Sequence, residues 1–412
     1  MNCEWLGFNL SSPVVLASLT PISHSRIEEH FNFIRDAFNF GAGAAVLGSI
    51  NPSYIGHPDY NYTQNDLLCI NSDLYVNHPH KSMMAISLIG PPFPNLTSVE
   101  YGINLIKHLR NGIKDAILIG SIINSGTSEE ITRAAVRIIE NGANAIELNL
   151  SCPNMKISDS KIKITGVTSR LIKKICDIVE KPISLKLSPT TNYDYILDDK
   201  KTMSMISGIT INNAYLGLVP PDIKSTKSPF NRSDYWSPTG IYGPFERMLT
   251  YYSLYTIQQK TKKYGIDISC VGGLVEGRHV IEAILLGAST VQLSSGILWK
   301  STRLIEQSNT ILYEYMKENG YESLEEFRGK SLDYIVDSTA DVEEYKSGGE
   351  KLKWQMPIPH ILENRCKVCL ECINSSCLAL SIDNIGKVII NADLCSGCGF
   401  CIQKCRFNAI KR

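Results

Sequence analysis

The C-terminal end of the chain concentrates the residues best suited to bind a metal centre. Eight of the 13 cysteines lie between residues 366 and 405, in two runs that each contain CxxCxxC and a later fourth cysteine. Three such thiolates can surround one iron–sulfur cubane, and the distant fourth cysteine conventionally binds the other cluster. The expected ligands are Cys366, Cys369, Cys372 and Cys405 for one [4Fe-4S] cluster and Cys395, Cys398, Cys401 and Cys377 for the second.

Zinc is the alternative occupant, but tetrahedral zinc does not need a third cysteine at this spacing in both runs. The pattern departs from bacterial ferredoxins at two places. Four residues rather than three precede Cys377, and Leu378 and Arg406 replace the usual prolines. A cluster pair has no catalytic pocket of its own, so we expect it to pass single electrons to a site elsewhere.

Short apolar runs alternate with helical patterns through the rest of the chain, which predicts βα units around a parallel sheet. Thr127 and Glu130 form a capping-box pattern before one helix, and Gly142 is placed to end it. Eight such units favour an α/β fold of the (β/α)₈ TIM-barrel type over an open sheet. The expected strands are Val14–Leu16, Ala44–Leu47, Ala116–Ile119, Ala145–Leu148, Ile183–Leu187, Ile206–Ile211, Ile266–Val271 and Thr290–Leu293.

The organisation of the remaining segments follows from their length and composition. Residues 50–115 are too long for one crossover and are expected to hold inserted loops or a hairpin. Residues 301 to about 360 are charged and mixed, end in WQMPIPH and resemble a linker. We expect a barrel at residues 1–330, a linker at 331–360 and a small ferredoxin-like two-cluster domain at 361–412.

Chemistry in such a barrel gathers at the carboxyl ends of the strands. One strand ends in NLSCPN, which brings Asn149 and Cys152 onto a single loop. Lys186 lies at the end of the next strand, where burying a cation is costly without an anionic partner. Small residues follow the last two strands and suit a phosphate site, because backbone N–H groups must approach an anion closely; they are Gly272, Gly273, Ser294 and Ser295.

NLSCPN, the KL of the next strand, and GG followed by QLSS resemble the FMN-binding barrel of dihydroorotate and dihydropyrimidine dehydrogenases, over roughly residues 1–330. The fused cluster domain and the length most resemble the FMN and iron–sulfur subunits of bacterial NAD-dependent dihydropyrimidine dehydrogenases, which reduce the 5,6 double bond of uracil or thymine. The resemblance implies that Cys152 is the general acid and that Lys186 contacts the flavin. It further implies that Asn71, Asp73, Asn149, Asn154 and Asn213 bind substrate, and that Ala17, Ser18, Gly243, Gly272, Gly273, Ser294 and Ser295 join Lys186 in binding FMN.

Elementary chemistry supports these roles. A side-chain amide offers both a donor and an acceptor and so complements the edge of a pyrimidine ring. Lys186 would stabilise negative charge on a reduced flavin, and Cys152 would protonate one ring carbon while flavin N5 gives hydride to its neighbour. The structural alternatives are that Cys152 is a small buried hydrophobe and that Asn71, Asp73 and Asn213 are turn residues. Cys3, Cys69, Cys176 and Cys270 are expected to have structural roles only.

Two positions depart from the family pattern. Gly48 stands where the family has a lysine beside flavin and substrate at the end of strand two, and Ala214 replaces a hydroxyl residue of the dihydropyrimidine enzymes. In the dihydroorotate relatives that lysine helps to bind the substrate carboxylate. Its absence argues against orotate and leaves uracil itself open.

Composition limits the partners. The 41 basic and 41 acidic residues cancel, which provides no field to attract nucleic acid or anionic lipid and disfavours a reductase of uridine in transfer RNA. No signal peptide and no apolar run of about 18 residues is visible, and the cysteine spacing indicates a reducing compartment, so we expect a cytoplasmic protein.

The electron source is a further expectation. No GxGxxG opens a βαβ unit, so the chain should not bind NAD(P)H alone. The resemblance implies a separate FAD- and NAD(P)H-dependent reductase subunit or another donor, in a homo- or hetero-oligomer. The alternatives are a ferredoxin-fused dihydroorotate dehydrogenase and a non-catalytic electron carrier or redox sensor.

Overall fold

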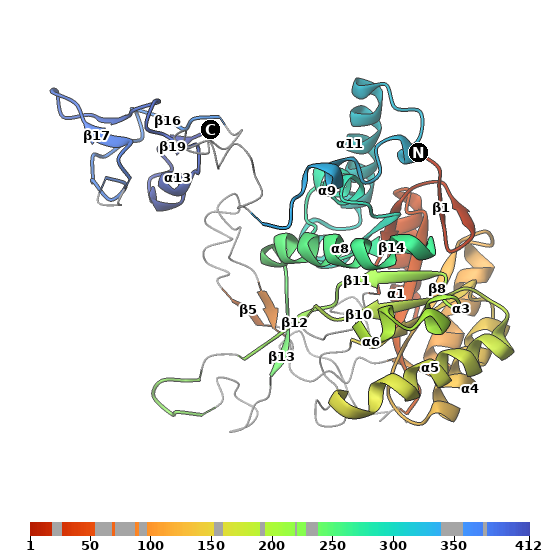
Figure 1. The fold of residues 1–412 in the computed structure, drawn as a ribbon. Helices are drawn as coiled ribbons and strands as arrows, with labels where there is room; N and C mark the ends of the chain where they lie inside the picture. The colour runs from red at the N-terminus through yellow and green to blue at the C-terminus, as the bar shows by residue number, and fades with distance from the viewer. Residues whose placement is uncertain are drawn as a thin grey trace. The chain divides into compact units, whose positions relative to one another are not determined.

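The computed structural model describes residues 1–18, 27–53, 68–70, 87–89, 97–151, 160–189, 194–218, 221–227, 238–338, 357–373 and 377–412. The chain divides into two compact units, which are described separately (Figure 1). The barrel unit extends to Tyr334, and the C-terminal unit contains Ile335–Arg412.

A closed ring of eight parallel strands forms the centre of the barrel unit. Each strand pairs with its neighbours in the order β3-β15-β14-β11-β10-β9-β8-β4, and pairing of β3 with β4 closes the ring. The eight strands occur where the sequence predicts them, so the TIM-barrel expectation is confirmed. Their bounds are β3 (Val14–Leu16), β4 (Ala44–Asn51), β8 (Leu118–Ile123), β9 (Ala145–Asn149), β10 (Ile183–Leu187), β11 (Gly208–Ile211), β14 (Asp267–Cys270) and β15 (Thr290–Leu293).

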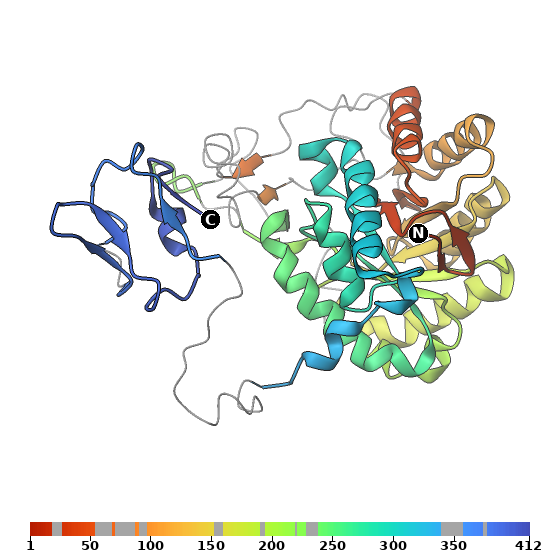
Figure 2. The ribbon, with the colours of Figure 1, turned by 90° about the horizontal axis from the view of Figure 1, so that it is seen from above.

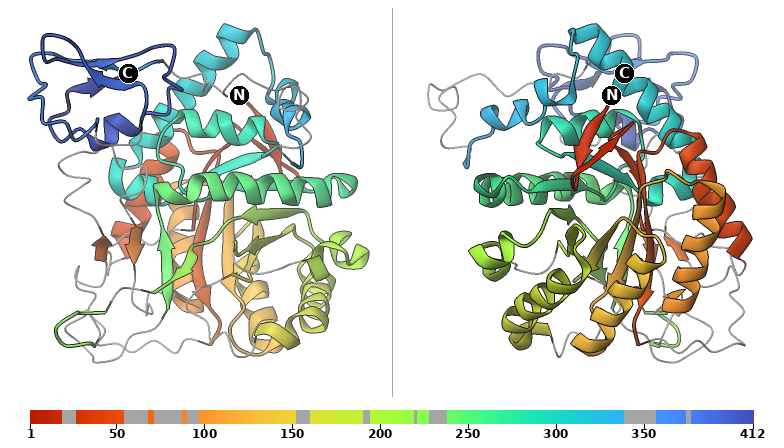
Figure 3. Two further views of the ribbon diagram at one scale, coloured as in Figure 1. Left: turned by 60° about the vertical axis from the view of Figure 1, so that its left-hand side comes forward. Right: turned by 90° about the vertical axis from the view of Figure 1, so that its right-hand side faces the viewer.

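Helices cover the outside of the ring, as Figures 2 and 3 show from three directions. Their apolar faces and the strands share one continuous core. The helices are α1 (Ile27–Asn39), α3 (Val99–Gly112), α4 (Ser128–Glu140), α5 (Ser160–Val179), α6 (Asp194–Leu197), α7 (Lys200–Met203), α8 (Arg247–Thr261), α9 (Arg278–Leu285), α10 (Ser295–Lys300) and α11 (Arg303–Asn319).

Helix α4 shows how local sequence sets an element. The Thr127 side chain accepts the Glu130 N–H at 3.2 Å, and the Glu130 carboxylate accepts the Thr127 N–H at 2.7 Å. The predicted capping box is therefore present and satisfies two donors that a helix start leaves open. Gly142 follows the helix with a φ of +113°, a conformation that costs glycine little.

A hairpin covers the amino ends of the barrel strands. Strand β1 (Cys3–Trp5) pairs with β2 (Phe8–Leu10), and Trp5 is buried. At the turn, the Leu6 N–H donates to the carboxylate of Asp267 at 2.8 Å, at the start of β14. This closure leaves the carboxyl ends as the face available for a site.

The long segment after β4 does contain an insertion. Strands β5 (Leu68–Ile70) and β6 (Ser87–Ile89) pair antiparallel, and β6 also pairs with β13 (Thr239–Tyr242), which pairs with β12 (Tyr215–Gly217). The insertion after β4 and the segment after β11 therefore share one small sheet. A further short strand, β7 (Thr97–Ser98), extends β4.

The prediction that residues 301 to about 360 resemble a linker is wrong for the first part of this range. Residues Arg303–Asn319 form α11, which buries Leu304, Ile305, Leu312 and Met316 against the barrel. Short 3-10 turns follow at η6 (Leu324–Glu326) and η7 (Lys330–Tyr334), and Phe327 between them is fully buried. The many charges of this helix lie on its solvent face, which explains why its composition resembles that of a linker.

The C-terminal unit is small. Strand β16 (His360–Ile361) pairs with β19 (Ile410–Lys411), and β17 (Leu380–Ile382) pairs with β18 (Val388–Ile390). The short helix α13 (Phe400–Lys404) contains Cys401 and is followed by Cys405. The buried core of the unit consists of Cys372, Leu380, Val388, Cys405, Ala409 and Ile410.

Candidate active site and cluster sites

Two of the predicted substrate asparagines meet at the mouth of the barrel. Asn149 ends β9 and is buried, and its Oδ1 accepts hydrogen bonds from the Ser151 N–H at 3.1 Å and the Ser151 hydroxyl at 2.8 Å. Asn213, just after β11, donates its Nδ2 to Asn149 Oδ1 at 3.3 Å and to Ser151 Oγ at 2.9 Å. The barrel thus joins residues 64 positions apart into one polar cluster.

Lys186 lies beside this cluster on β10. It is opposite Asn149 on β9 in the register of the sheet, and only 5% of it is exposed. Among the residues that the structure describes, none forms a hydrogen bond or ion pair with its ammonium group. A buried cation of this kind is costly unless an anionic ligand completes its surroundings.

Glycines form a second part of the mouth, after β14. Gly272 and Gly273 have φ values of +128° and +72°. A side chain on Gly272 would meet Thr250 Oγ1 at 2.5 Å, and one on Gly273 would meet the backbone N and Cα of Arg247. The turn is therefore open only to glycine, and its backbone is free to approach a ligand closely.

The turn after β15 packs against this glycine turn. Ser294 precedes α10 and Ser295 begins it, and a side chain on Gly296 would meet the Leu274 backbone oxygen. On the other side, the Ala17 N–H donates to Leu293 O at 3.0 Å. The predicted phosphate-binding residues therefore belong to adjoining turns.

Several features fit a phosphorylated planar cofactor at this mouth. Ser18 Oγ is buried and has no partner among the described residues, as an orphaned donor awaiting a ligand would be. Gly243, also expected to touch the cofactor, has a φ of +138°. Together with the glycine turn and the buried ammonium of Lys186, the residues present match the group that the sequence implies.

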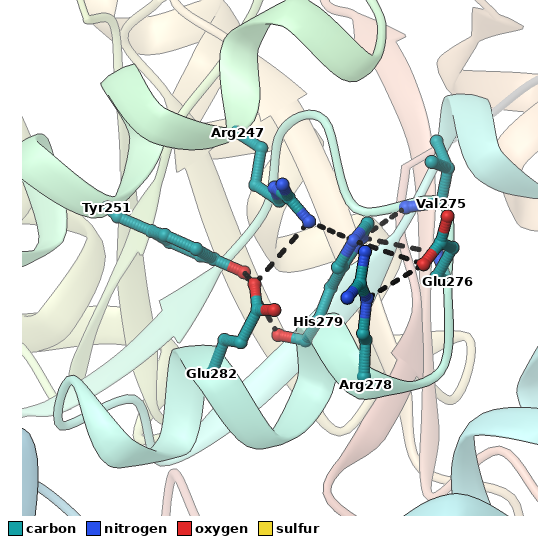
Figure 4. A network of polar contacts seen from close by, with 7 residues as sticks. All are labelled: Arg247, Tyr251, Val275, Glu276, Arg278, His279 and Glu282. Atoms are coloured by element: carbon teal, nitrogen blue, oxygen red, sulfur yellow. Dashed lines mark hydrogen bonds and ion pairs between the residues drawn. The ribbon is translucent and has the colours of Figure 1, made fainter. Parts of the chain in front are cut away.

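A network of polar contacts stabilises the segment that directly follows the glycine turn (Figure 4). His279 Nδ1 accepts the N–H groups of Val275 at 3.0 Å and Glu276 at 3.2 Å, just after the turn. Burial, and then the charge of Arg247, lower the pKa of His279 to about 3, so the ring stays neutral and keeps accepting. Arg247 contacts His279 and lies 3.5 Å from Glu282, which joins α8 to α9 and holds the turn between them.

Sequence reasoning missed Glu246, which ends η4 (Pro244–Glu246). Only 2% of it is exposed, and its Oε1 has no partner among the described residues. Burial raises the pKa of its carboxyl to about 8. The backbone N–H groups of Gly243 and Tyr215 and the charge of Lys186 act in the opposite direction and lower this pKa, but by less. The only hint in the sequence is an acid three residues after Gly243.

A second buried acid lies in the barrel interior and was also missed. Glu147 on β9 accepts hydrogen bonds from the hydroxyls of Ser121 and Thr210, each at 2.8 Å. Gln292 on β15 donates to the same Thr210 oxygen at 3.3 Å. This layer links four strands beneath the mouth and helps to fix their relative positions.

Gly48 shows why no lysine stands at the end of strand two. Its φ is +133°, and a Cβ there would lie 2.6 Å from the Ser121 backbone oxygen. The pairing of β4 with β8 shifts register between Leu47 and Ile50 at this point. The local backbone therefore leaves no room for the lysine that the sequence resemblance implies at this position.

Four predicted site residues, Cys152, Asn154, Asn71 and Asp73, lie outside the described residues. Three cysteines expected to be structural are seen: Cys270 and Cys3 are buried, which raises the pKa of each thiol to about 12, and Cys176 contacts Met205 O at 3.4 Å. Cys69 lies on β5, and its side chain is outside the described part.

The eight C-terminal cysteines gather as two sets of four. A cavity in the C-terminal unit is lined by Cys366, Cys369, Cys372 and Cys405, together with apolar side chains that include Val388 and Ala409. Burial raises the pKa of Cys372, and the same three thiols raise it further. These are the members of the first predicted set.

The second set shows the same grouping around Cys401. Burial raises the pKa of its thiol to about 11, and Cys395, Cys398 and Cys377 add to the shift. Backbone N–H groups also point at sulfur, from Gly397 to Cys395 at 3.4 Å and from Ala409 to Cys405 at 3.2 Å. Thiols with such donors suit iron–sulfur clusters.

A single metal ion fits less well. Among the described residues, no three His, Cys, Asp or Glu side chains converge as the ligands of one ion do. A [4Fe-4S] cubane instead takes one thiolate on each of four irons, and four thiols line the cavity.

Comparison with known families agrees with both units. The model of the dihydroorotate dehydrogenase family matches residues 80–316. The chain belongs to this family. A 4Fe-4S binding domain matches residues 388–411, so the family barrel is joined here to an iron–sulfur domain, and the protein is an oxidoreductase of the flavin-dependent dehydrogenases.

The relatives of this family member include dihydropyrimidine dehydrogenases and dihydroorotate dehydrogenases. It is 25% identical over 256 residues to the chloroplastic dihydropyrimidine dehydrogenase (NADP(+)) of Arabidopsis thaliana, covering 60% of each chain. It is 26% identical over 328 residues to the catalytic subunit of dihydroorotate dehydrogenase B (NAD(+)) of Thermoplasma volcanium, covering 79% of this chain and 96% of that one.

A third relative also has a subunit name. The chain is 25% identical over 243 residues to the NAD-dependent dihydropyrimidine dehydrogenase subunit PreA of Escherichia coli, covering 58% of each. The matched part thus spans less than two thirds of both dihydropyrimidine enzymes. In the described part of this family member, no helix is both long and apolar enough to cross a bilayer.

Proposed function

We propose that the chain is an FMN- and iron–sulfur-dependent oxidoreductase that reduces, or in reverse oxidises, the 5,6 CH–CH bond of a pyrimidine or related cyclic amide. Single electrons would pass through two [4Fe-4S] clusters. A separate FAD- and NAD(P)H-dependent subunit, or another donor, would deliver them. The observation that carries the proposal is the cluster of Asn149, Ser151 and Asn213 beside the buried Lys186, whose ammonium has no partner among the described residues.

The polar cluster suits an amide-containing ring. Asn149 Oδ1 is already occupied by Ser151 and Asn213, which fixes the plane of the Asn149 amide. Among the described residues, the N–H groups of Asn149 Nδ2 make one longer contact, at 3.4 Å to Ser49. They therefore remain able to donate to a ring carbonyl, and a fixed amide distinguishes donor from acceptor on the ligand.

When bound, FMN supplies hydride chemistry at N5. In the proposed site the backbone of Gly272 and Gly273, with Ser294 and Ser295, binds the phosphate, and Ala17, Ser18 and Gly243 line the ring. Lys186 stabilises negative charge at the reduced ring. Cys152 gives its thiol proton to the substrate carbon next to the one that takes hydride and recovers a proton from solvent. Asn71, Asp73 and Asn154 complete the substrate contacts.

In the C-terminal unit, Cys366, Cys369, Cys372 and Cys405 would hold one cluster and Cys395, Cys398, Cys401 and Cys377 the other. The two separate groups of thiols support this assignment. We place the barrel domain at residues 1–330, the linker at 331–360 and the cluster domain at 361–412. A cytoplasmic location and assembly into an oligomer belong to the same proposal.

A dihydroorotate dehydrogenase with a fused ferredoxin domain is the second candidate, because such enzymes are among the relatives. Gly48 disfavours it, since the backbone leaves no room for the cation that meets a substrate carboxylate in those enzymes. Anaerobic reoxidation of the reduced protein by uracil, thymine and orotate compares the two directly. Orotate as the fastest oxidant would replace the leading proposal with this one.

The role of Cys152 has its own test. Cys152→Ser is expected to keep FMN and clusters and to slow single-turnover reoxidation by the best substrate by roughly 10² to 10⁴, the usual contribution of a placed general acid. Cys176→Ser, which alters a thiol on helix α5, is the matched control and should react at the normal rate. An unchanged rate in Cys152→Ser would remove Cys152 from the mechanism.

A further inference from the structure

Glu246 is a buried acid at the cofactor mouth that no step above uses. Groups from three parts of the barrel lie near its carboxyl: Lys186 on β10, the backbone of Tyr215 on β12, and Gly272 after β14. Its Oε2 lies 3.3 Å from the point that a Gly272 side chain would occupy. It therefore lies close to the turn proposed to hold the phosphate and within the electrostatic influence of the buried cation.

Burial disfavours the charged form of this carboxyl more than the backbone N–H groups of Gly243 and Tyr215 and the charge of Lys186 favour it. The Lys186 ammonium is not within ion-pair distance of the Glu246 carboxyl, and Glu246 Oε1 has no partner among the described residues. A second anion next to a phosphate would be repelled in this poorly solvated place, whereas a neutral carboxylic acid would donate a hydrogen bond.

We propose that Glu246 is a positioning residue of the cofactor site that keeps its proton while FMN is bound, so that loss of this proton weakens FMN binding. This inference rests on the proposed function, because it takes FMN as the ligand of the mouth.

Of the ionisable groups around this site, Glu246 is the one whose protonation changes between pH 7 and pH 9. Burial raises its pKa to about 8, and burial also raises the pKa of Tyr215 to about 12, so the phenol stays neutral. Lys186 faces the carboxyl from β10. Arg247 follows in sequence, but its guanidinium contacts His279 and Glu282 instead. Thr250 on α8 carries no charge.

The size of the effect follows from the fraction of protonated sites. With a pKa of about 8, the protonated form falls from nearly all molecules at pH 7 to about one in ten at pH 9, and the dissociation constant of FMN rises about tenfold. Neutral substitutions should abolish this dependence.

The experiment titrates FMN into full-length, cluster-loaded protein freed of flavin, under anaerobic conditions, and follows flavin fluorescence at pH 7 and pH 9. Wild-type protein is expected to bind about tenfold more weakly at pH 9. Glu246→Gln should bind at both pH values within about twofold of wild type at pH 7, because its amide is neutral and still donates. Glu246→Leu, which is neutral but cannot donate, should also lack the pH dependence and serves if the glutamine variant folds poorly.

Three results would overturn the inference: equal wild-type affinity at the two pH values, the same weakening in the glutamine variant, or much weaker binding by that variant at pH 7. Failure of the wild-type chain to bind FMN at either pH would instead defeat the proposed function. Circular dichroism of each variant shows that the barrel is intact.

Discussion

The two units of the chain reach stability by different routes. The barrel buries a continuous apolar core and builds its site from strand ends that the ring brings together. The C-terminal unit has six buried core residues, and two of them, Cys372 and Cys405, are predicted cluster ligands. A domain this small rarely folds on its apolar core alone. The barrel should therefore tolerate loss of its cofactor, whereas the C-terminal unit should not.

Removal of iron gives the largest expected effect. Anaerobic chelation should unfold the C-terminal unit as a whole, because its core loses the centre that its thiols surround. Hydrogen exchange measured by mass spectrometry would show loss of protection in β17 and β18 and unchanged protection in β9 and β10. Continued protection of β17 and β18 after complete iron loss would show that the small core suffices.

A change in the glycine turn tests the same contrast from the barrel side. Gly272→Ala places a side chain against Thr250 at a positive φ, which costs about 1–3 kcal/mol locally, so FMN affinity should fall about tenfold or more. Circular dichroism should show a folded barrel. Gly265→Ala is the matched control, since Gly265 also has a positive φ, of +62°, with open space around it. Equal FMN affinity in both variants would mean that the turn does not form the phosphate site.

The smallest effect concerns a single cap. Thr127→Ala removes one side of the capping box of α4 and should lower the free energy of unfolding of the barrel by about 1 kcal/mol, measured by denaturant titration. Thr310→Ala on the exposed face of α11 should change it less. A loss of several kcal/mol at Thr127 would indicate that barrel stability depends on one helix start rather than on its whole core.

The features of the fold and the site that could be predicted are those that a local spacing of residues in the sequence reveals. The eight barrel strands and both sets of four cysteines were predicted, because alternation and CxxCxxC spacing are local signals. Asn149 and Asn213 were placed together only through the assumption of a closed ring, which the strand pairing confirms.

The failures share a different cause. Glu246 and Glu147 look like any surface acid in the sequence, because burial arises from elements packed around them from distant positions. The charged helix α11 resembled a linker for the opposite reason: its charges face solvent, and five of its 17 residues are buried. In both cases the prediction depends on whether a side chain faces the protein interior or the solvent.

Gly48 also has a consequence for the substitutions that its position can accept. The backbone at Gly48 curves so that an added side chain would strike the main-chain oxygen of Ser121. A substitution at this position alone would therefore place a side chain against the backbone at the point where the pairing of β4 with β8 shifts register. Any larger residue at position 48 would have to be accompanied by a movement of the backbone of β4 or β8.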